Sequence, residues 1–215
     1  MEISFLGHSS FKLKGKSVTV VTDPYGVTAG KYPKDVIADI VTVSHDHEDH
    51  NAAENVRGEA FKVQYPGEFE IKGVSIIGIP SWHDEKNGEE RGKNIVYVIE
   101  IDGLRIAHLG DLGDKLTAEQ LEEMGAIDIL LVPVGGKYTI DAKKALEVVK
   151  QVDPWVAIPM HYQDEGLDTK MFGELTGVGE FLKIMDKPNI EPMSKYIVSS
   201  DRLPSEFTLI WLQKK

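Results

Sequence analysis

The apolar runs of this chain are short, and their length constrains the fold more than any other feature of the sequence. In the first half they alternate with polar turns, a pattern that predicts strands rather than helices. Asp102-Gly103 suits a tight type I′ turn and predicts a hairpin between two of these strands. The expected strands cover residues 2–6, 10–13, 16–22, 40–43, 60–64, 74–79, 95–101 and 105–108.

The second half alternates strands with helices. Thr117 begins Thr-Ala-Glu-Gln, which predicts a capping box, and Gly125 suits the end of that helix. Asp141 is expected to cap a second helix that runs to about Gln151. Shorter helices are expected at 51–56 and 179–185, and strands at 127–134, 155–160, 196–199 and 206–212. This order predicts a layered α/β fold, with sheets inside and helices outside, in a single domain of residues 1–215.

Composition excludes several classes of site. The formal net charge is −11 and the Lys and Arg residues are scattered along the chain, which disfavours nucleic acid and anionic membranes as partners. The absence of cysteine excludes disulfides, thiolate metal ligands and cysteine nucleophiles. With no signal-peptide pattern and no apolar run of ~20 residues, we expect a cytoplasmic protein without a membrane segment. The oligomeric state cannot be read from the sequence.

Histidines occur at strand ends throughout the sequence. Random placement would have put some of them on helix surfaces, yet each lies at or just beyond the end of an expected strand, which predicts that they converge. The seven are His8, His45, His47, His50, His83, His108 and His161. Two carboxylates accompany them, Asp49 inside the segment 45–50 and Asp111 between two glycines in His-Leu-Gly-Asp-Leu-Gly.

Imidazole and carboxylate groups together are typical ligands of zinc, iron and manganese. His45 and His47 are two residues apart, so on an extended backbone both rings would point to the same side, while Asp49 and His50 would turn toward a second centre. His83 and His161 are positioned to supply further nitrogens, and Asp111 has two oxygens with which to join two metals. Taken singly, a His-x-His pair is more often a polar surface turn, and Asp111 is equally suited to forming a turn.

The residues resemble the metallo-β-lactamase superfamily. His-Asp-His-Glu-Asp-His at 45–50 matches its H-x-H-x-D-H motif in full, and His83, Asp111 and His161 follow in the order of its later ligand motifs. More narrowly, the chain resembles the ascorbate-6-phosphate lactonase type and its Zn-dependent hydrolase relatives. That resemblance spans residues 6–162 through the segments LGHSSF, PSWHD, HLGDLG, VPVGGKYT and IPMHY.

The resemblance implies a four-layer αββα sandwich with its site at one edge between the sheets. It implies a first metal on His45, His47 and His83 and a second on Asp49, His50 and His161, with Asp111 bridging them. The two ions are expected to be Zn²⁺, with Mn²⁺ or Fe as alternatives. His8 and His108 are expected to orient ligands by hydrogen bonds. His47 stands where the flavodiiron branch carries an acidic residue, which favours hydrolysis over that branch's redox chemistry.

The function predicted from these residues is metal-dependent hydrolysis of a small phosphoester, lactone or related ester or amide. A hydroxide held by the metals would attack the substrate, with Asp49 and Asp111 as catalytic residues. Lys137 and Tyr138, in a Gly-rich loop, are candidates to contact an anionic group of the substrate. Three alternatives stay open: a mononuclear iron oxidoreductase of the same fold, an RNA or DNA phosphodiesterase, and a binding module whose metals are structural.

Overall fold

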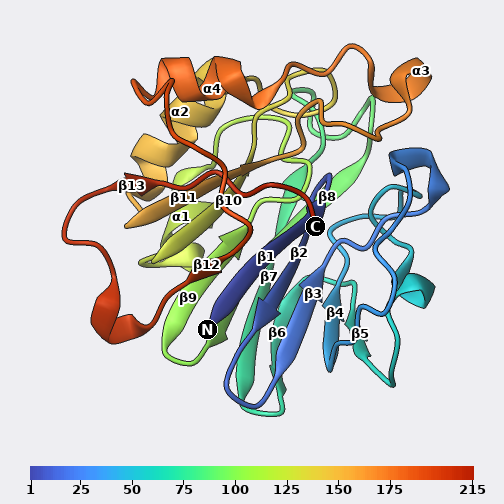
Figure 1. Cartoon of the computed structure of the whole chain (residues 1–215), viewed down its shortest axis with the longest axis vertical. Helices are drawn as coiled ribbons and strands as arrows, with labels where there is room; N and C mark the ends of the chain where they lie inside the picture. The colour runs from blue at the N-terminus through green and yellow to red at the C-terminus, as the bar shows by residue number, and fades with distance from the viewer.

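Two mixed β-sheets form the frame of the computed structural model, which describes all residues from 1 to 215 (Figure 1). The first sheet has six strands in the order β12 (Tyr196–Ile197), β1 (Glu2–Gly7), β2 (Ser10–Lys14), β3 (Thr19–Thr22), β4 (Ile40–Thr42) and β5 (Phe61–Val63). The second has seven strands in the order β13 (Thr208–Leu209), β11 (Val156–Met160), β10 (Ile129–Pro133), β9 (Leu104–His108), β8 (Lys93–Ile101), β7 (Val74–Trp82) and β6 (Gly67–Ile71).

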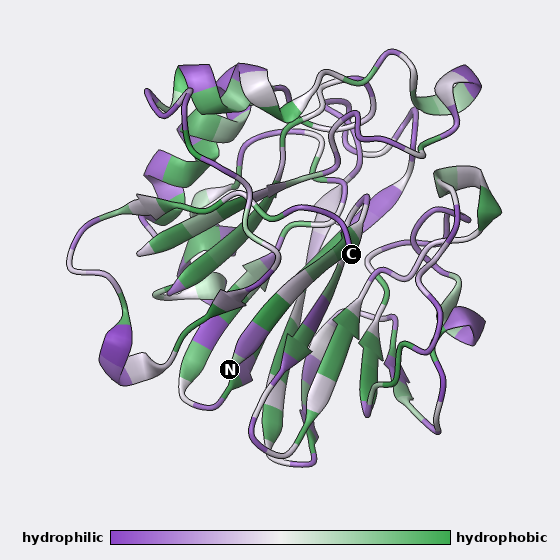
Figure 2. Ribbon diagram, in the orientation of Figure 1, coloured by the Kyte–Doolittle hydropathy of each residue, from purple (hydrophilic) through white to green (hydrophobic).

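The main core lies between the two sheets. Ile3 and Phe5 on β1 alternate with Glu2 and Ser4, so one face of the strand joins a core cluster of 46 buried residues. Figure 2 shows the same alternation of apolar and polar positions on the strands at the front of the molecule. The Tyr97 hydroxyl on β8 donates to the carbonyl oxygens of Val43 and Val63, at 3.1 and 3.3 Å, and so ties the second sheet to the ends of β4 and β5.

The longer helices pack on the second sheet. α1 (Ala118–Met124) contacts β7, α2 (Ala142–Val152) contacts β10 and α4 (Val178–Ile184) contacts β11 and α2. The expected capping box of Thr117 with Gln120 and the cap by Asp141 are both present. The remaining short elements are α3 (Thr169–Phe172), η1 (Val27–Ala29), η2 (Ala53–Asn55) and η3 (Ser200–Arg202).

Several expected elements differ from the observed ones. The strand expected at 16–22 begins at Thr19, the helix expected at 51–56 is the single 3₁₀ turn η2, and the two closing strands shrink to two residues each. Strand β6 was not expected, because only Phe69 and Ile71 of its five residues are even partly buried. The hairpin at Asp102-Gly103 has both residues at positive φ, 55° and 75°, as a type I′ turn requires.

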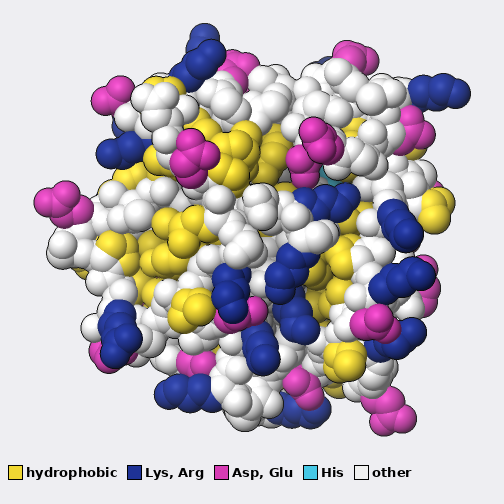
Figure 3. Space-filling model, viewed as in Figure 1, with side chains coloured by type: hydrophobic (Ala, Val, Ile, Leu, Met, Phe, Trp, Pro, Cys, Tyr) yellow, Lys and Arg dark blue, Asp and Glu magenta, His cyan; other side chains and the backbone are white.

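Lys and Arg side chains gather over the outer face of the first sheet (Figure 3). Lys12 and Lys14 lie opposite Ser4 and Glu2 in the β1–β2 register, while Lys195 and Lys215 approach the Glu2 carboxylate at 2.7 and 4.0 Å. Partial burial and the charges of Lys215 and Lys14 lower the pKa of Lys12.

None of the helices combines the length and apolar composition needed to cross a membrane.

Candidate metal centre

The segment after β4 places its polar side chains by turning sharply. The chain bends at 44–46 and then closes a turn in which the N–H groups of His50 and Asn51 donate to the His47 carbonyl. The backbone is therefore not extended at His45, contrary to the expectation, yet the rings of His45 and His47 still lie 4.5 Å apart between centroids. The bend brings both rings to one side without the help of a strand.

The expected ligand residues converge in three overlapping groups. The first group is His45, His47 and His83, and the second is Asp49, His50 and His161 together with His8. The third group takes His45 and His50 from the other two and adds Asp111. Within each group the potential ligand atoms lie within 4.8 Å of one another. Every residue that the sequence analysis placed in a metal sphere belongs to at least one of these groups.

Asp111 lies between the first and second groups. Its Oδ2 is 3.2 Å from both His83 Nε2 and His161 Nε2, and its Oδ1 is 3.3 Å from His50 Nε2. Its backbone N–H donates to Asn94 Oδ1 at 3.0 Å. The preceding Gly110 has a φ of +55°, and a Cβ there would lie 2.3 Å from Asn94 Oδ1 and 2.7 Å from Ser44 Cβ. Only glycine allows this approach, which fixes the Asp111 carboxylate at the centre of the site.

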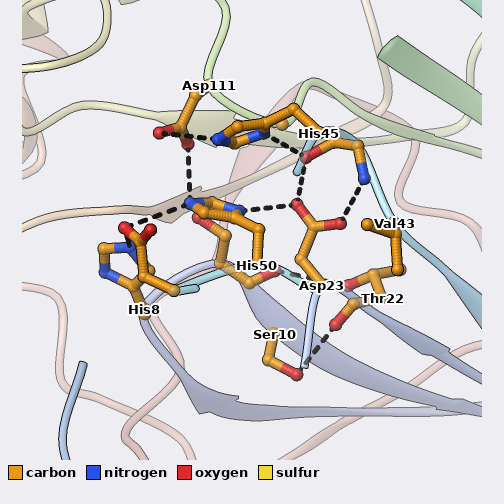
Figure 4. A network of polar contacts seen from close by, with 12 residues as sticks. His8, Ser10, Thr22, Asp23, Val43, His45, His50 and Asp111 are labelled. Atoms are coloured by element: carbon orange, nitrogen blue, oxygen red, sulfur yellow. Dashed lines mark hydrogen bonds and ion pairs between the residues drawn. The ribbon is translucent and has the colours of Figure 1, made fainter. Parts of the chain in front are cut away.

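A second layer of hydrogen bonds fixes the orientation of two rings (Figure 4). The buried Asp23 carboxylate accepts from the N–H and hydroxyl of Ser44, at 2.8 and 2.5 Å, and from His50 Nδ1 at 2.8 Å. Because the Ser44 hydroxyl hydrogen goes to Asp23, Ser44 Oγ accepts from His45 Nδ1 at 2.9 Å. Both rings are therefore held through Nδ1 and turn Nε2 toward Asp111, where Nε2 can ligate a metal ion.

Asp23 was missed by the sequence analysis. It follows the buried strand β3 directly, so it carries the same strand-end signal as the histidines, but Asp23-Pro24 also fits an ordinary turn. Although burial alone would raise the pKa of Asp23, the His108 and His50 rings outweigh it and hold that pKa below its ordinary value. Asp23 is thus an anion, and it accepts hydrogen bonds from Ser44 and His50 on the side of the site away from Asp111.

His8 and His108 hold other parts of the site in place by hydrogen bonds. His108 is fully buried, with Nε2 donating to the Ser9 carbonyl at 2.8 Å and Nδ1 accepting from the Gly110 N–H at 3.2 Å. His8 Nε2 is 3.0 Å from Asp49 Oδ2, and burial, followed by the nearby His161, lowers the pKa of His8 to about 4. Neutral His8 therefore donates to Asp49 and holds that carboxylate in place, although it lies inside the second group.

The donor set fits metal ions. The Nε2 atoms of His45, His50 and His161 and Oδ1 of Asp111 are buried without a hydrogen-bond partner, a costly state for polar atoms unless a cation is bound. Burial, together with the nearby His50, holds the pKa of His45 well below its ordinary value, which keeps its ring neutral and able to ligate. Burial would raise the pKa of Asp111, but the His161 and His50 rings outweigh it and hold that pKa well below its ordinary value.

Two cavities open over the groups and share three lining residues, Asp46, His47 and Arg91. One, of about 430 Å³, lies over Asp49, His83 and Asp111, and the other, of about 920 Å³, extends beside His45. Tyr138 lines the smaller cavity, with its hydroxyl donating to the Met171 carbonyl at 2.9 Å. Lys137 lines neither cavity, because its ammonium pairs with Glu174 at 2.6 Å. Of the two residues expected to contact substrate, the fold brings only Tyr138 to the site.

The profile of the β-lactamase superfamily domain matches residues 2–161 of the chain. The chain belongs to the β-lactamase superfamily. The resemblance drawn from the sequence motifs is thereby confirmed, and so is the α/β sandwich.

Relatives within the superfamily narrow the assignment. The chain is 32% identical over 190 residues to a UPF0173 metal-dependent hydrolase of Thermococcus onnurineus, with 75% of this chain and 84% of that protein covered. It is 31% identical over 221 residues to a UPF0173 metal-dependent hydrolase of Thermoplasma acidophilum, with 89% and 96% covered. The crystal structure of a candidate Zn-dependent hydrolase of the superfamily from Thermotoga maritima matches with a TM-score of 0.83 and 38% identity, over 100% of this chain and 99% of that one. This β-lactamase-superfamily chain is a metal-dependent hydrolase.

Proposed function

We propose that this hydrolase works with two divalent metal ions, Zn²⁺ or Mn²⁺, on a small phosphoester, lactone or related ester or amide. The observation that supports two ions is the position of Asp111 Oδ2, equally distant from His83 Nε2 and His161 Nε2 at 3.2 Å. One ion would be held by His45, His47 and His83, and the other by Asp49, His50 and His161, with Asp111 shared. Bound there, such ions supply Lewis acidity and lower the pKa of water.

The residues around the ions have distinct tasks. His47 is exposed and lines both cavities, so the first group is open to a substrate from the cavity side. The Asp49 side chain is 18% exposed and lines the smaller cavity, where its carboxylate can take a proton from an attacking water and pass it to the leaving group. The hydrogen bond from His8 keeps Asp49 facing that water.

Metal content tests the dinuclear proposal. Protein purified without chelator or nickel affinity resin should contain close to two Zn or Mn per chain by inductively coupled plasma mass spectrometry. His47→Ala should lower that number, because it removes one of three nitrogens from the first group. Glu54→Gln, an exposed change just after the ligand segment, should keep both ions. About one iron per chain, with oxygen consumed in the presence of a thiol or persulfide, would instead favour the oxidoreductase.

Chelation separates a catalytic centre from a purely structural one. Removing the ions should abolish hydrolysis and lower the melting temperature by about 5 to 15 °C while leaving a folded chain, because ligands that bind only the folded state stabilise it by mass action. Zinc or manganese should restore both activity and melting temperature, as read by differential scanning calorimetry and a panel of phosphodiester and lactone substrates. A chain that unfolds completely without metal would favour the binding module. Selective cleavage of RNA or DNA would favour the nuclease.

A further inference from the structure

The larger cavity is polar at its floor, but its polar atoms are already engaged. Asn94 Nδ2 donates to Ser81 Oγ at 2.7 Å and to the Leu109 carbonyl at 2.9 Å, and Asn94 Oδ1 accepts from the Asp111 N–H. Ser44 Oγ is occupied by Asp23 and His45. The charged partners that the lining offers a ligand are Arg91 and Lys93, and Asp46 is its one carboxylate.

Arg91 is held in place by the loop that follows His83. The buried Asp84 carboxylate accepts four backbone N–H groups of this loop, those of Lys86 and Gly88 at 2.8 and 3.0 Å and those of Glu90 and Arg91 at 3.1 and 2.8 Å. The next residue, Gly92, accepts from the His83 N–H at 3.1 Å. The Arg91 backbone is thus fixed relative to a candidate metal ligand.

The Arg91 side chain reaches over the junction of the two cavities. Its guanidinium carbon lies 5.7 Å from the centre of the Tyr138 ring, within the range of a cation–π contact. Its one ion-pair contact is with Glu90, whose Oε2 is 3.8 Å from Nη1, too far for a hydrogen bond. The guanidinium therefore keeps donors free to bind a planar oxyanion.

Aromatic side chains form the outer walls of the same cavity. Tyr65, after β5, and Trp82, at the end of β7, line it while remaining 66% and 42% exposed. Gly88 packs against the indole so closely that a Cβ there would lie 2.6 Å from Trp82 Cε3. Partly exposed aromatic rings beside a free guanidinium are suited to a ligand that carries both an apolar ring and a negative charge.

We propose that Arg91 is a specificity-determining residue, which binds an anionic group of the substrate at the junction of the two cavities while an aryl or similar apolar portion lies between Tyr65 and Trp82. This inference rests on the proposed hydrolytic function and narrows its substrates to esters or phosphoesters that carry a further carboxylate or phosphate. Lys93 adds a second positive charge at the rim.

A matched pair of esters tests the role of Arg91 in turnover. Mono-4-nitrophenyl succinate and 4-nitrophenyl butyrate differ in having a carboxylate or a methyl at the far end of the acyl chain. The wild-type protein, loaded with zinc or manganese, should prefer the succinate. Arg91→Ala should lower the ratio of kcat/KM for succinate over butyrate by about 10- to 100-fold, mainly through KM, since hydrogen bonds to charged groups contribute that much. Arg91→Lys should keep part of the preference, and the exposed Arg202→Ala should keep all of it.

A binding measurement keeps the inference separate from hydrolysis. The metal-loaded protein is titrated with benzoate, phenylphosphonate and neutral benzyl alcohol, and binding is followed by tryptophan fluorescence. The variant Trp82→Phe shows whether the change in fluorescence comes from Trp82. The wild type should bind one or both anions at least about tenfold more tightly than the alcohol, and Arg91→Ala should remove that advantage. The two anions distinguish a carboxylate from a phosphate. Because the metal centre is the same in both proteins, the difference reports on Arg91.

The ester kinetics and the binding titration can contradict different claims. A wild type that hydrolyses neither ester nor any other substrate would contradict the proposed function, and the binding measurement would still decide the role of Arg91. Equal losses for both esters in Arg91→Ala, or unchanged affinity of that variant for both anions, would overturn the inference even in an active hydrolase.

Discussion

Asp111→Asn should reduce kcat/KM for metal-dependent hydrolysis on the order of 10³-fold, the largest loss of activity that we expect from any single isosteric change in this chain. The asparagine side chain has the same shape but no charge, so it cannot bridge two cations between His83 and His161. Its amide N–H₂ would also donate to the Nε2 atoms that are expected to ligate the metals, and so compete with metal binding. Metal content should fall with activity, and steady-state kinetics beside mass spectrometry would show both.

Asp114→Asn is the matched control for that change. Asp114 lies three residues further along, is exposed, and pairs with Lys144 at 3.0 Å on the surface. Losing a surface pair of this kind changes stability by about 0 to 1 kcal/mol and should leave kcat/KM unaltered. If Asp111→Asn retained full metal content and activity, the bridging role of Asp111 would have to be abandoned.

Asp23→Ala should have the largest effect on stability, about 3 to 5 kcal/mol in the free energy of unfolding. The change removes a fully buried carboxylate and leaves the Ser44 N–H and His50 Nδ1 without their acceptor. The metal affinity should fall by about 10- to 100-fold as well, because His45 and His50 lose the contacts that orient them. Chemical denaturation and competition with a fluorescent zinc chelator would measure the two effects.

Asp35→Asn serves as the comparison for the effect on stability. Asp35 is exposed, pairs with Arg57 on the surface and has a φ of 62°, which asparagine tolerates. It should change the free energy of unfolding by less than about 1 kcal/mol. A similar small change for Asp23→Ala, with unaltered zinc affinity, would show that the network around Asp23 does not support the centre.

The convergence of the histidines was predictable because strands are easy to recognise when their apolar runs are short and end in polar residues. Once the runs ending at His45, His83, His108 and His161 are taken as strands, their polar ends are expected to lie together at one edge of a sandwich. The grouping of these residues was likewise predictable, because the spacing in H-x-H-x-D-H survives the unexpected bend at 44–46.

Residues that act through long-range contacts and belong to no motif were not predictable. Asp23 meets Ser44 and His50 across 21 and 27 residues of sequence, and no local pattern distinguishes it from a turn aspartate. Arg91 lies in a charged run that resembles ordinary surface, and only the hydrogen bonds to Asp84 show that this loop is ordered. Lys137 was selected for its Gly-rich neighbourhood, but Glu174, distant in sequence, pairs with it instead.

The division of the ligands along the chain affects folding. His45, His47, Asp49 and His50 are neighbours in sequence, so the unfolded chain already offers a local chelating segment to a metal ion. Ions bound there stabilise the denatured ensemble as well as the native one, and they offset part of the native stabilisation. His83, Asp111 and His161 follow strands of the second sheet and lie far from residues 45–50 in sequence, so we expect them to join the site only once that sheet has docked. We therefore expect those three residues to determine how strongly a metal favours the folded state. Zinc added before refolding should bind early without completing the site.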